Sequence, residues 1–348
     1  MKKIYWIINQ LNISDSAIYA VEIANKLVQY RSVSIIVLGK NNNLSNVSGK
    51  IDIIYLDIDD KEIVNDKLTS YFKANKLKLK DRISELTTKN DIIISTSYLS
   101  SYIVPKGRRF LYYYDKTKDI FLSFKSKLER KKYRNPDNYI FSSIELKKAL
   151  EKKKKYHGSY QIYPSSILYP ALDFKLNNTI SYIYNESDNY LLPLEIINEL
   201  KDLKIKLNYY SNLKVNDSIL SYIKSNGLTK IVNILEYEDI IDVFKNSDIY
   251  INLNKNNALP LNIIDAMSQG RIIISYNNEA VDESMSIIIN EKNIVESINE
   301  IKELFIKQKR LEKYKQQSFN LSFRYNKEMV IAKWLDILEI EDNLIHKE

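Results

Sequence analysis

The segment from Ser247 to Ser275, SDIYINLNKNNALPLNIIDAMSQGRIIIS, has the residue types and order of an anion-binding site. Alternating apolar residues predict a buried strand, and the polar loop after it contains one cation, Lys255. A short amphipathic helix follows, and a turn at Gly270 leads into a second strand. Backbone N–H groups at a helix N-terminus bind phosphates, so we predict a phosphate-binding loop at residues 258–262. Pro260 donates no hydrogen bond, which the first turn of a helix tolerates.

The amino-acid composition limits which catalytic nucleophiles, bases and metal sites the chain can form. The chain has no cysteine, which excludes thiol nucleophiles, disulfides and zinc–thiolate sites and agrees with a cytoplasmic location. The two histidines, His157 and His346, lie in a basic loop and at the end of the chain, so we expect neither to act as a base. Asp115, which ends the strand pattern RRFLYYYD, is the best-placed carboxylate in the first half of the chain.

The elements that must position these residues alternate along the whole chain. In the first half, strands are predicted at residues 3–9, 33–39, 50–58, 91–97, 108–115 and 138–143, with helices at 16–30 and 145–153. In the second half, strands are predicted at residues 179–185, 205–212, 231–237, 248–254 and 271–277, with helices at 215–228, 238–247 and 259–270. This alternation is typical of α/β domains in which helices cover both faces of a parallel sheet.

The charge is distributed unevenly. Residues 1–173 carry 31 Lys and Arg against 18 Asp and Glu, although the net charge of the whole chain is only +8. The excess is concentrated in residues 108–155, which could be a solvated face or a surface for anionic lipid or a phosphate-bearing acceptor. No aromatic-rich binding motif or zinc finger accompanies this segment, so we expect no nucleic-acid partner.

The sequence Asn257–Ile274, NALPLNIIDAMSQGRIII, resembles the donor motif of retaining GT-B glycosyltransferases, especially glycosyltransferase family four. The family pattern, roughly E-G-F-P-L-V-x-L-E-A-M-A-x-G-x-P-V-I-A, aligns with it without a gap. Residues 13–38, 167–173, 221–254 and 323–338 are similar to other segments of the family, so the resemblance covers nearly the whole chain. It implies the GT-B fold, in which two doubly wound Rossmann-like α/β domains face each other across a cleft.

The resemblance also implies the domain boundaries. The first domain, on the acceptor side, spans residues 1–165. The stretch YPSSILYPALDF at its end contains two prolines and no helical period, and we assign residues 166–173 of it as the linker. The second domain, which binds the nucleotide sugar, spans residues 174–322. The segment 323–348 contains a closing helix that returns to the first domain.

In the family, the cleft binds a nucleotide diphosphate sugar. The resemblance places Asp265 at the ribose hydroxyls and Asn257 where a glutamate faces the transferred sugar. The nucleotide-binding residues that it implies are Ala258, Leu259, Leu261, Asn262 and Asp265. No metal or other cofactor is implied, because cations of the protein neutralise the leaving diphosphate.

The cations expected for that role are missing from their usual positions. Tyr184-Asn185 stands where the family has Gly-Arg, and no lysine follows. Asp15-Ser16 replaces a glycine pair in the first domain, and Tyr114-Asp115 replaces a His-Asp pair, which makes Asp115 a candidate contact for the acceptor or the donor sugar. Three other cations flank the expected site and could substitute, although each could equally be a surface residue: Lys214, Lys255 and Arg271.

Two hypotheses of different classes follow. The first is a retaining glycosyltransferase of the hexosyltransferase type, which adds a sugar to a glycan or lipid-linked glycan acceptor. We expect it in the cytoplasm, either free or peripheral at the inner face of a membrane. The base of the donor nucleotide is left open. The second is a non-catalytic GT-B protein that serves as a partner or acceptor-binding subunit, which the missing cations favour.

Overall fold

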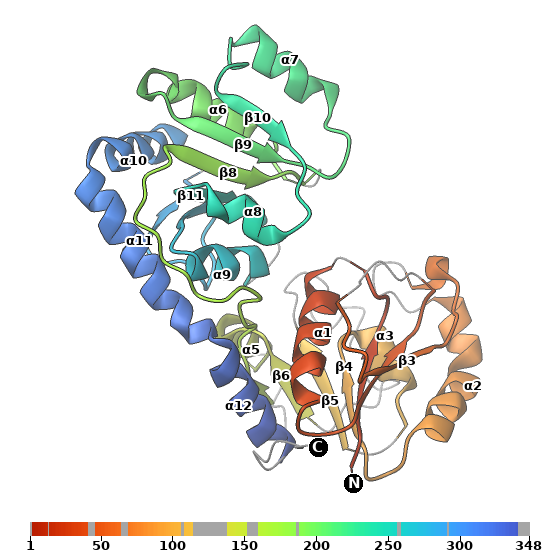
Figure 1. The fold of residues 1–348 in the computed structure, drawn as a ribbon. Helices are drawn as coiled ribbons and strands as arrows, with labels where there is room; N and C mark the ends of the chain where they lie inside the picture. Colours follow the sequence, from red (N-terminus) through yellow and green to blue (C-terminus); the bar gives the residue numbers. More distant parts are fainter. Residues whose placement is uncertain are drawn as a thin grey trace. The chain divides into compact units, whose positions relative to one another are not determined.

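The computed structural model describes residues 2–12, 14–40, 46–63, 69–105, 108–113, 138–151, 159–185, 188–255, 259–290 and 292–339. The chain divides into two compact units, of which the first contains Met1–Ser165 and Lys327–Glu348 and the second contains Ser166–Asn326. Each unit is built on one parallel sheet (Figure 1). The expected fold class, two doubly wound α/β domains, is confirmed.

The first sheet has the strand order β3-β2-β1-β4-β5-β6-β7. Its strands are β1 (Ile4–Ile8), β2 (Val33–Val37), β3 (Asp52–Tyr55), β4 (Ile92–Ser95), β5 (Arg108–Tyr113), β6 (Asn138–Phe141) and β7 (Ser159–Gln161). β1 and β2 are buried along their whole length, as expected for continuous apolar runs in a sheet that is covered on both faces.

The helices of the first unit are α1 (Asp15–Leu27), α2 (Ser70–Leu86), α3 (Tyr98–Ile103), α5 (Ile144–Glu151) and α12 (Lys327–Leu338), with a 3-10 turn η1 at Asp60–Glu62. Helix α12 brings the end of the chain back into this unit. The indole N–H of Trp334 donates a hydrogen bond to the hydroxyl of Tyr19 in α1 (3.0 Å), and its ring centroid lies 5.3 Å from that of Trp6 in β1. Both tryptophans are fully buried, so α12 completes the core of the first unit.

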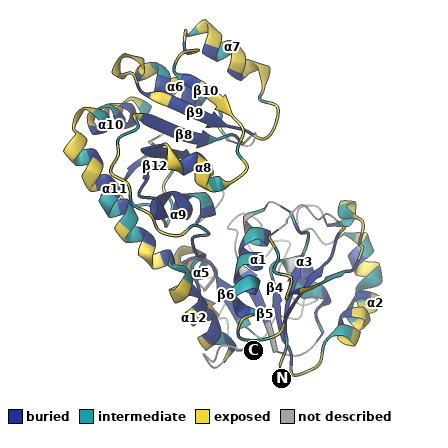
Figure 2. Ribbon diagram, viewed as in Figure 1, coloured by how far each residue is buried: buried dark blue, intermediate teal, exposed yellow. Residues whose placement is uncertain are grey.

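The second sheet has the strand order β10-β9-β8-β11-β12-β13. Its strands are β8 (Thr179–Ile183), β9 (Lys206–Tyr210), β10 (Val232–Leu235), β11 (Ile249–Asn252), β12 (Ile272–Ser275) and β13 (Ser286–Ile288). Its helices are α6 (Leu192–Glu199), α7 (Asp217–Ser225), α8 (Ile240–Lys245), α9 (Leu261–Ser268), α10 (Ile294–Ile306) and α11 (Gln308–Ser322), with 3-10 turns η4 at Lys201–Leu203 and η5 at Phe323–Tyr325. Figure 2 shows the central strands buried, whereas β10 at the edge is largely exposed.

Two glycines end helices as the sequence predicts. Gly270 follows α9 and Gly227 follows α7, each with φ of +67, a left-handed backbone that favours glycine. At Gly270 the following N–H, that of Arg271, bonds to the carbonyl of Ala266 (2.9 Å), which closes a Schellman motif. Helix α7 is capped at its other end by Asn216, whose side chain accepts a hydrogen bond from the N–H of Ser218.

The structure adds elements that the sequence pattern does not predict. In the first unit these are α2, α3 and β7, and in the second unit they are α6, β13, α10 and α11. Helix α2 is the clearest case, since KLKLK alternates as in a strand, whereas the helical spacing of Phe72, Leu79 and Ile83 is what buries this segment.

Candidate functional site

The second sheet reverses its direction of winding between β8 and β11. The chain continues from β8 to β9 and β10 on one side and from β11 to β12 and β13 on the other, while β8 and β11 pair in parallel. Ligands of doubly wound sheets bind beyond the carboxyl ends of the strands at such a switch point. The segments that follow β8, β9, β11 and β12 therefore form the candidate site.

Helix α9 begins at this end of the sheet, and the residue at its N-cap is a proline. Pro260 is the N-cap residue, with φ of −64 and ψ of 132, and its side chain makes no capping hydrogen bond. The sequence analysis places Pro260 in the first turn of this helix, whereas in the structure it lies one position before that turn. The N–H groups of Leu261 and Asn262 have no acceptor within the helix. Such N–H groups point away from the helix and carry partial positive charge, which suits them to a phosphate.

The predicted nucleotide-binding residues of this loop differ in what they can offer. The side chains of Leu259 and Leu261 are buried, so these two residues could bind a ligand only through their backbones. Asn262 is half-buried in the first turn of α9. Five other predicted or considered residues lie outside the described part of the chain: Asp115, His157, Asn257, Ala258 and His346.

Lys255 and Lys214 are both exposed and follow β11 and β9, the two strands that pair with β8. Lys255 lies after β11, and its ammonium is 4.4 Å from the ring centroid of Tyr276, which follows β12. A cation–π contact of this kind holds the ammonium near the carboxyl ends of both strands. Lys214 follows β9 in a turn closed by Ser211, whose hydroxyl donates to the carbonyl of Leu213 (2.7 Å). The structure therefore provides two cations at the edge where the family's clamp residues are absent.

Tyrosines pack around the start of the segment Tyr184-Asn185, which aligns with the expected Gly-Arg pair. Tyr184 follows β8 and is buried, with its ring centroid 5.8 Å from that of Tyr190 and 6.0 Å from that of Tyr209. The hydroxyl of Tyr209 donates to the carbonyl of Tyr190 (3.1 Å). This aromatic packing ties the segment after β8 to β9, and it supplies no positive charge to the site.

Asn212 and Tyr237 form a second polar feature that the sequence analysis does not identify. The amide of Asn212 donates to the carbonyl of Tyr237 (2.9 Å), and its oxygen accepts from the N–H of Tyr237 (3.0 Å). The Tyr237 ring meets that of Tyr210 edge to face at 6.0 Å. The pair fixes the loops after β9 and β10 relative to each other, and no local sequence pattern marks a pair 25 residues apart.

Asp265, the residue predicted to contact ribose, is 1% exposed. One of its carboxylate oxygens, Oδ1, accepts hydrogen bonds from the Ser166 hydroxyl (2.7 Å), the Ile167 N–H (2.7 Å) and the Leu168 N–H (3.2 Å). These donors belong to the segment that enters the second unit, about a hundred residues earlier in sequence. The contact with ribose stays a prediction, and in the structure this oxygen accepts from residues 166–168.

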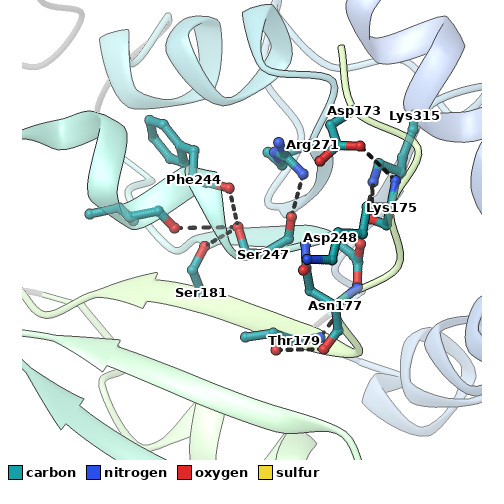
Figure 3. Close-up of polar contacts among 11 residues, drawn as sticks. Asp173, Lys175, Asn177, Thr179, Ser181, Phe244, Ser247, Asp248, Arg271 and Lys315 are labelled. Atoms are coloured by element: carbon teal, nitrogen blue, oxygen red, sulfur yellow. Dashed lines mark hydrogen bonds and ion pairs between the residues drawn. The ribbon is translucent and has the colours of Figure 1, made fainter. Parts of the chain in front are cut away.

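Arg271 is neither a surface residue nor a cation of the site, which corrects both interpretations of it. It precedes β12, is 3% exposed and donates from Nη1 to the carbonyl of Ser247, which precedes β11. Those are the amino ends of the strands, opposite the switch-point edge. Burial lowers the pKa of Arg271, and the nearby Asp248 opposes that shift. Figure 3 shows Arg271 beside Asp248 and Lys315 in this buried cluster.

The first unit has its own switch point, between β1 and β4. Asn9 follows β1, and its side-chain oxygen accepts a hydrogen bond from the hydroxyl of Ser97, which follows β4 (2.7 Å). Asp15 and Ser16 form the first turn of α1, with Ser14 as N-cap. The chain therefore begins a helix at the place where the family has its glycine pair.

Two searches of the described residues bear on metals and membranes. No group of three or more His, Asp or Glu side chains in the described part of the chain is arranged to hold a metal ion. Among the described helices, none combines the length and the apolar character needed to cross a membrane.

Comparisons with known proteins were made in sequence and in structure. No protein-family model matches the chain, and no curated protein matches it in sequence. A crystal structure of an S. aureus TarM mutant in complex with fondaparinux, α-GlcNAc-glycerol and UDP is 11% identical with a TM-score of 0.72, over 97% of this chain and 99% of that chain. A glycosyltransferase from Rickettsia africae is 14% identical with a TM-score of 0.73, over 98% and 99%.

A third match is Anabaena Alr3699/HepE in complex with UDP and glucose, which is 12% identical with a TM-score of 0.71, over 97% of this chain and all 100% of that chain. Identities this low establish the fold and nothing beyond it. The fold is the expected GT-B fold, and the match extends over nearly the full length of each of these chains.

Proposed function

We propose that this protein is a glycosyltransferase that moves a sugar from a nucleotide diphosphate sugar to a glycan acceptor. The observation that carries the proposal is the N-terminus of α9 at the switch point, with exposed Lys255 after β11 and exposed Lys214 after β9, the two strands that flank β8. Backbone N–H groups and two ammonium groups together suit a diphosphate. Similarity in fold to proteins crystallised with UDP supports the same assignment.

The proposed reaction retains the configuration of the sugar and needs no separate base. The bond between the anomeric carbon and the diphosphate oxygen breaks, and the acceptor hydroxyl oxygen bonds to that carbon from the same face. The hydroxyl proton passes to the departing phosphate oxygen. The α9 N–H groups and the two lysines stabilise the charge that grows on the diphosphate. We propose that Asn257 faces the transferred sugar and that Asp115 contacts the acceptor.

Thermal unfolding in the presence of nucleotides tests the donor site. We expect one of UDP-, GDP-, dTDP- or ADP-sugars to raise the Tm, because a ligand that binds only the folded state stabilises it by RT ln(1 + [L]/Kd). The variant Lys214→Met/Lys255→Met should lose most of this shift, since each charge-assisted contact contributes about 1.5–3 kcal/mol. Lys313→Met is the matched control, because Lys313 is an exposed lysine on α11.

The results separate the two hypotheses about activity. A shift that the double lysine variant loses and Lys313→Met keeps supports the enzyme. If millimolar concentrations of every nucleotide sugar leave the Tm of the unaltered protein unchanged, the donor site does not exist as proposed. The chain would then be better described as a non-catalytic partner subunit.

A lipid-linked acceptor would place the enzyme at an anionic membrane, and we propose helix α2 as part of that contact. The basic segment 108–155 is described only at 108–113 and 138–151, whereas α2 is described throughout. Helix α2 carries five Lys and Arg against two Asp and Glu. Lys73 and Lys78 are exposed on either side of Leu77, whose exposed fraction is 73%. An apolar side chain among lysines matches an anionic lipid surface.

Binding to phosphatidylcholine vesicles with and without phosphatidylglycerol tests this contact. The variant Lys73→Gln/Lys78→Gln should bind the anionic vesicles more weakly by about fivefold per lysine, since a lysine near such a surface contributes about 1 kcal/mol. The control is Lys309→Gln/Lys313→Gln, which removes two exposed lysines from α11. Equal losses in both variants would mean that α2 has no special part in lipid binding.

A further inference from the structure

The segment that enters the second unit lies along helix α9 and is hydrogen-bonded to it. Asp265, in the second turn of α9, accepts three hydrogen bonds at Oδ1 from the side chain and backbone of residues 166–168. Further along, the N–H of Ala171 donates to the carbonyl of Ser268 (2.9 Å) and the side chain of Gln269 donates to the carbonyl of Tyr169 (2.8 Å). We call residues 166–172 the brace.

The last contact of the brace involves the glycine that ends the helix. A Cβ built on Gly270 would lie 2.4 Å from Cδ1 of Leu172, so the side chain of Leu172 occupies the space that any other residue would fill. The brace therefore follows α9 from Asp265 to its C-terminal cap. All of these contacts lie within the second unit.

The chemistry of position 265 suits this contact. A single carboxylate oxygen can accept several hydrogen bonds, and bonds to an ionised acceptor are shorter and stronger than neutral ones. Two of the three distances at Oδ1 are 2.7 Å, and the side chain is 1% exposed. Oδ1 of this short carboxylate is therefore engaged as an acceptor by residues 166–168.

We propose that Asp265 is a positioning residue. Its hydrogen bonds to the brace fix the orientation of the donor-binding N-terminus of α9, and it does not itself bind the ribose of the nucleotide. This inference rests on the proposed function. Asp265 lies one turn after Leu261, and a helix transmits a shift or rotation along its axis because its turns are rigidly bonded. Loss of the brace contact would then misdirect the N–H groups of Leu261 and Asn262.

The positioning role of Asp265 predicts how substitutions in the brace change the affinity for ribose and deoxyribose nucleotides. We would measure the affinities of UDP, GDP and ADP, each beside its 2′-deoxy counterpart, by calorimetry at a temperature where circular dichroism shows every variant folded. We expect Ser166→Ala and Asp265→Ala to weaken binding of the ribose and deoxyribose forms by the same factor, about tenfold, since one charge-assisted hydrogen bond is worth at least that. Asp265→Asn, which keeps an acceptor oxygen, should recover most of the affinity.

Several outcomes overturn the proposal. A residue that only stabilises the fold leaves the affinity of the folded protein unchanged, so unaltered affinity in Ser166→Ala rejects the positioning role. A preference for ribose in the unaltered protein that Asp265→Asn abolishes, with Ser166→Ala unaffected, shows that Asp265 reads the ribose. Failure of the unaltered protein to bind any of these nucleotides rejects the proposed function, and the inference with it.

Discussion

The buried ion pair between Asp248 and Lys315 should be among the most sensitive points of the second unit. Both side chains are 0% exposed, and the Lys315 ammonium lies 3.3 Å from Asp248 Oδ1 (Figure 3). The other carboxylate oxygen accepts from the N–H groups of Asn177 (3.0 Å) and Thr179 (3.4 Å), at the start of β8. Asp248→Asn removes the negative charge and leaves the shape nearly unchanged.

The magnitude follows from what the substitution leaves behind. Removal of one partner of a buried pair costs about 3–5 kcal/mol, because an uncompensated charge stays buried. Here Lys315 would face a neutral amide in place of the carboxylate, with the carbonyl of Lys175 as an uncharged acceptor (3.2 Å) and the charge of Arg271 nearby. We therefore expect Asp248→Asn to lower the free energy of unfolding by about 3–5 kcal/mol near neutral pH.

The loss should depend on pH in a definite direction. Burial lowers the pKa of Lys315 below its ordinary 10.5, and the Asp248 carboxylate opposes that shift. Without the carboxylate the pKa of folded Lys315 falls further, so the unfolded state binds more protons between that pKa and 10.5. Stability therefore rises with pH in this window. The difference in the free energy of unfolding between Asp248→Asn and the unaltered protein should therefore be smaller at about pH 9.5 than at about pH 7, because the buried lysine loses its proton as the pH rises.

Urea unfolding at the two pH values measures the effect, with the slope m as a check that the same surface unfolds. Lys315→Met is the companion variant, because it removes the buried charge and should partly rescue Asp248→Asn. The coupling between the two changes should exceed about 1 kcal/mol, as contacting residues require. A loss below about 1 kcal/mol at neutral pH, or one that is the same at both pH values, would refute the reasoning about a costly buried charge.

Three further predictions concern stability. Gly270→Ala should lower the free energy of unfolding by about 1–2 kcal/mol in urea, because it strains a left-handed backbone and displaces Leu172, whereas Gly227→Ala meets no neighbour and should cost less. Burial raises the pKa of Tyr19 and Tyr182 well above 10.0, so stability present below pH 10 is lost above it, by about 3 kcal/mol at pH 11 for the pair. Tyrosinate absorbance should then appear together with unfolding. Asp265→Ala should lower the Tm by about 10 °C, as the loss of three hydrogen bonds implies, and Asp265→Asn by less than half of that.

The sheets could be predicted because their signal is local. The runs of β1, β4 and β12 are nearly continuous apolar residues rich in isoleucine, and such runs bounded by polar turns are typical of buried parallel strands. Helix α2 could not be predicted in the same way. Its lysines alternate with leucines, and the burial of Phe72 and Ile83 against the first sheet decides for a helix.

The candidate site was predictable in place and only partly in detail. The N-terminus of α9 and the cation Lys255 follow from a strand–loop–helix pattern within one segment. The contacts of Asp265 are another matter, because its partner Ser166 is 99 residues away in sequence and no periodic pattern marks such a pair. The pairing of Asn212 with Tyr237 across 25 residues is hidden for the same reason.

Strand β11 also shows why the charged residues around one motif have different roles. Asp248 precedes β11 and Arg271 precedes β12, and parallel pairing brings them together at the amino ends, where both are buried. Lys255 follows β11, at the carboxyl ends, and is exposed. Ligands of doubly wound sheets bind beyond the carboxyl ends of the strands at the switch point. Lys255 and Arg271 both flank the loop in sequence, but strand direction places Arg271 in the buried interior and leaves Lys255 as a candidate for the proposed diphosphate contact.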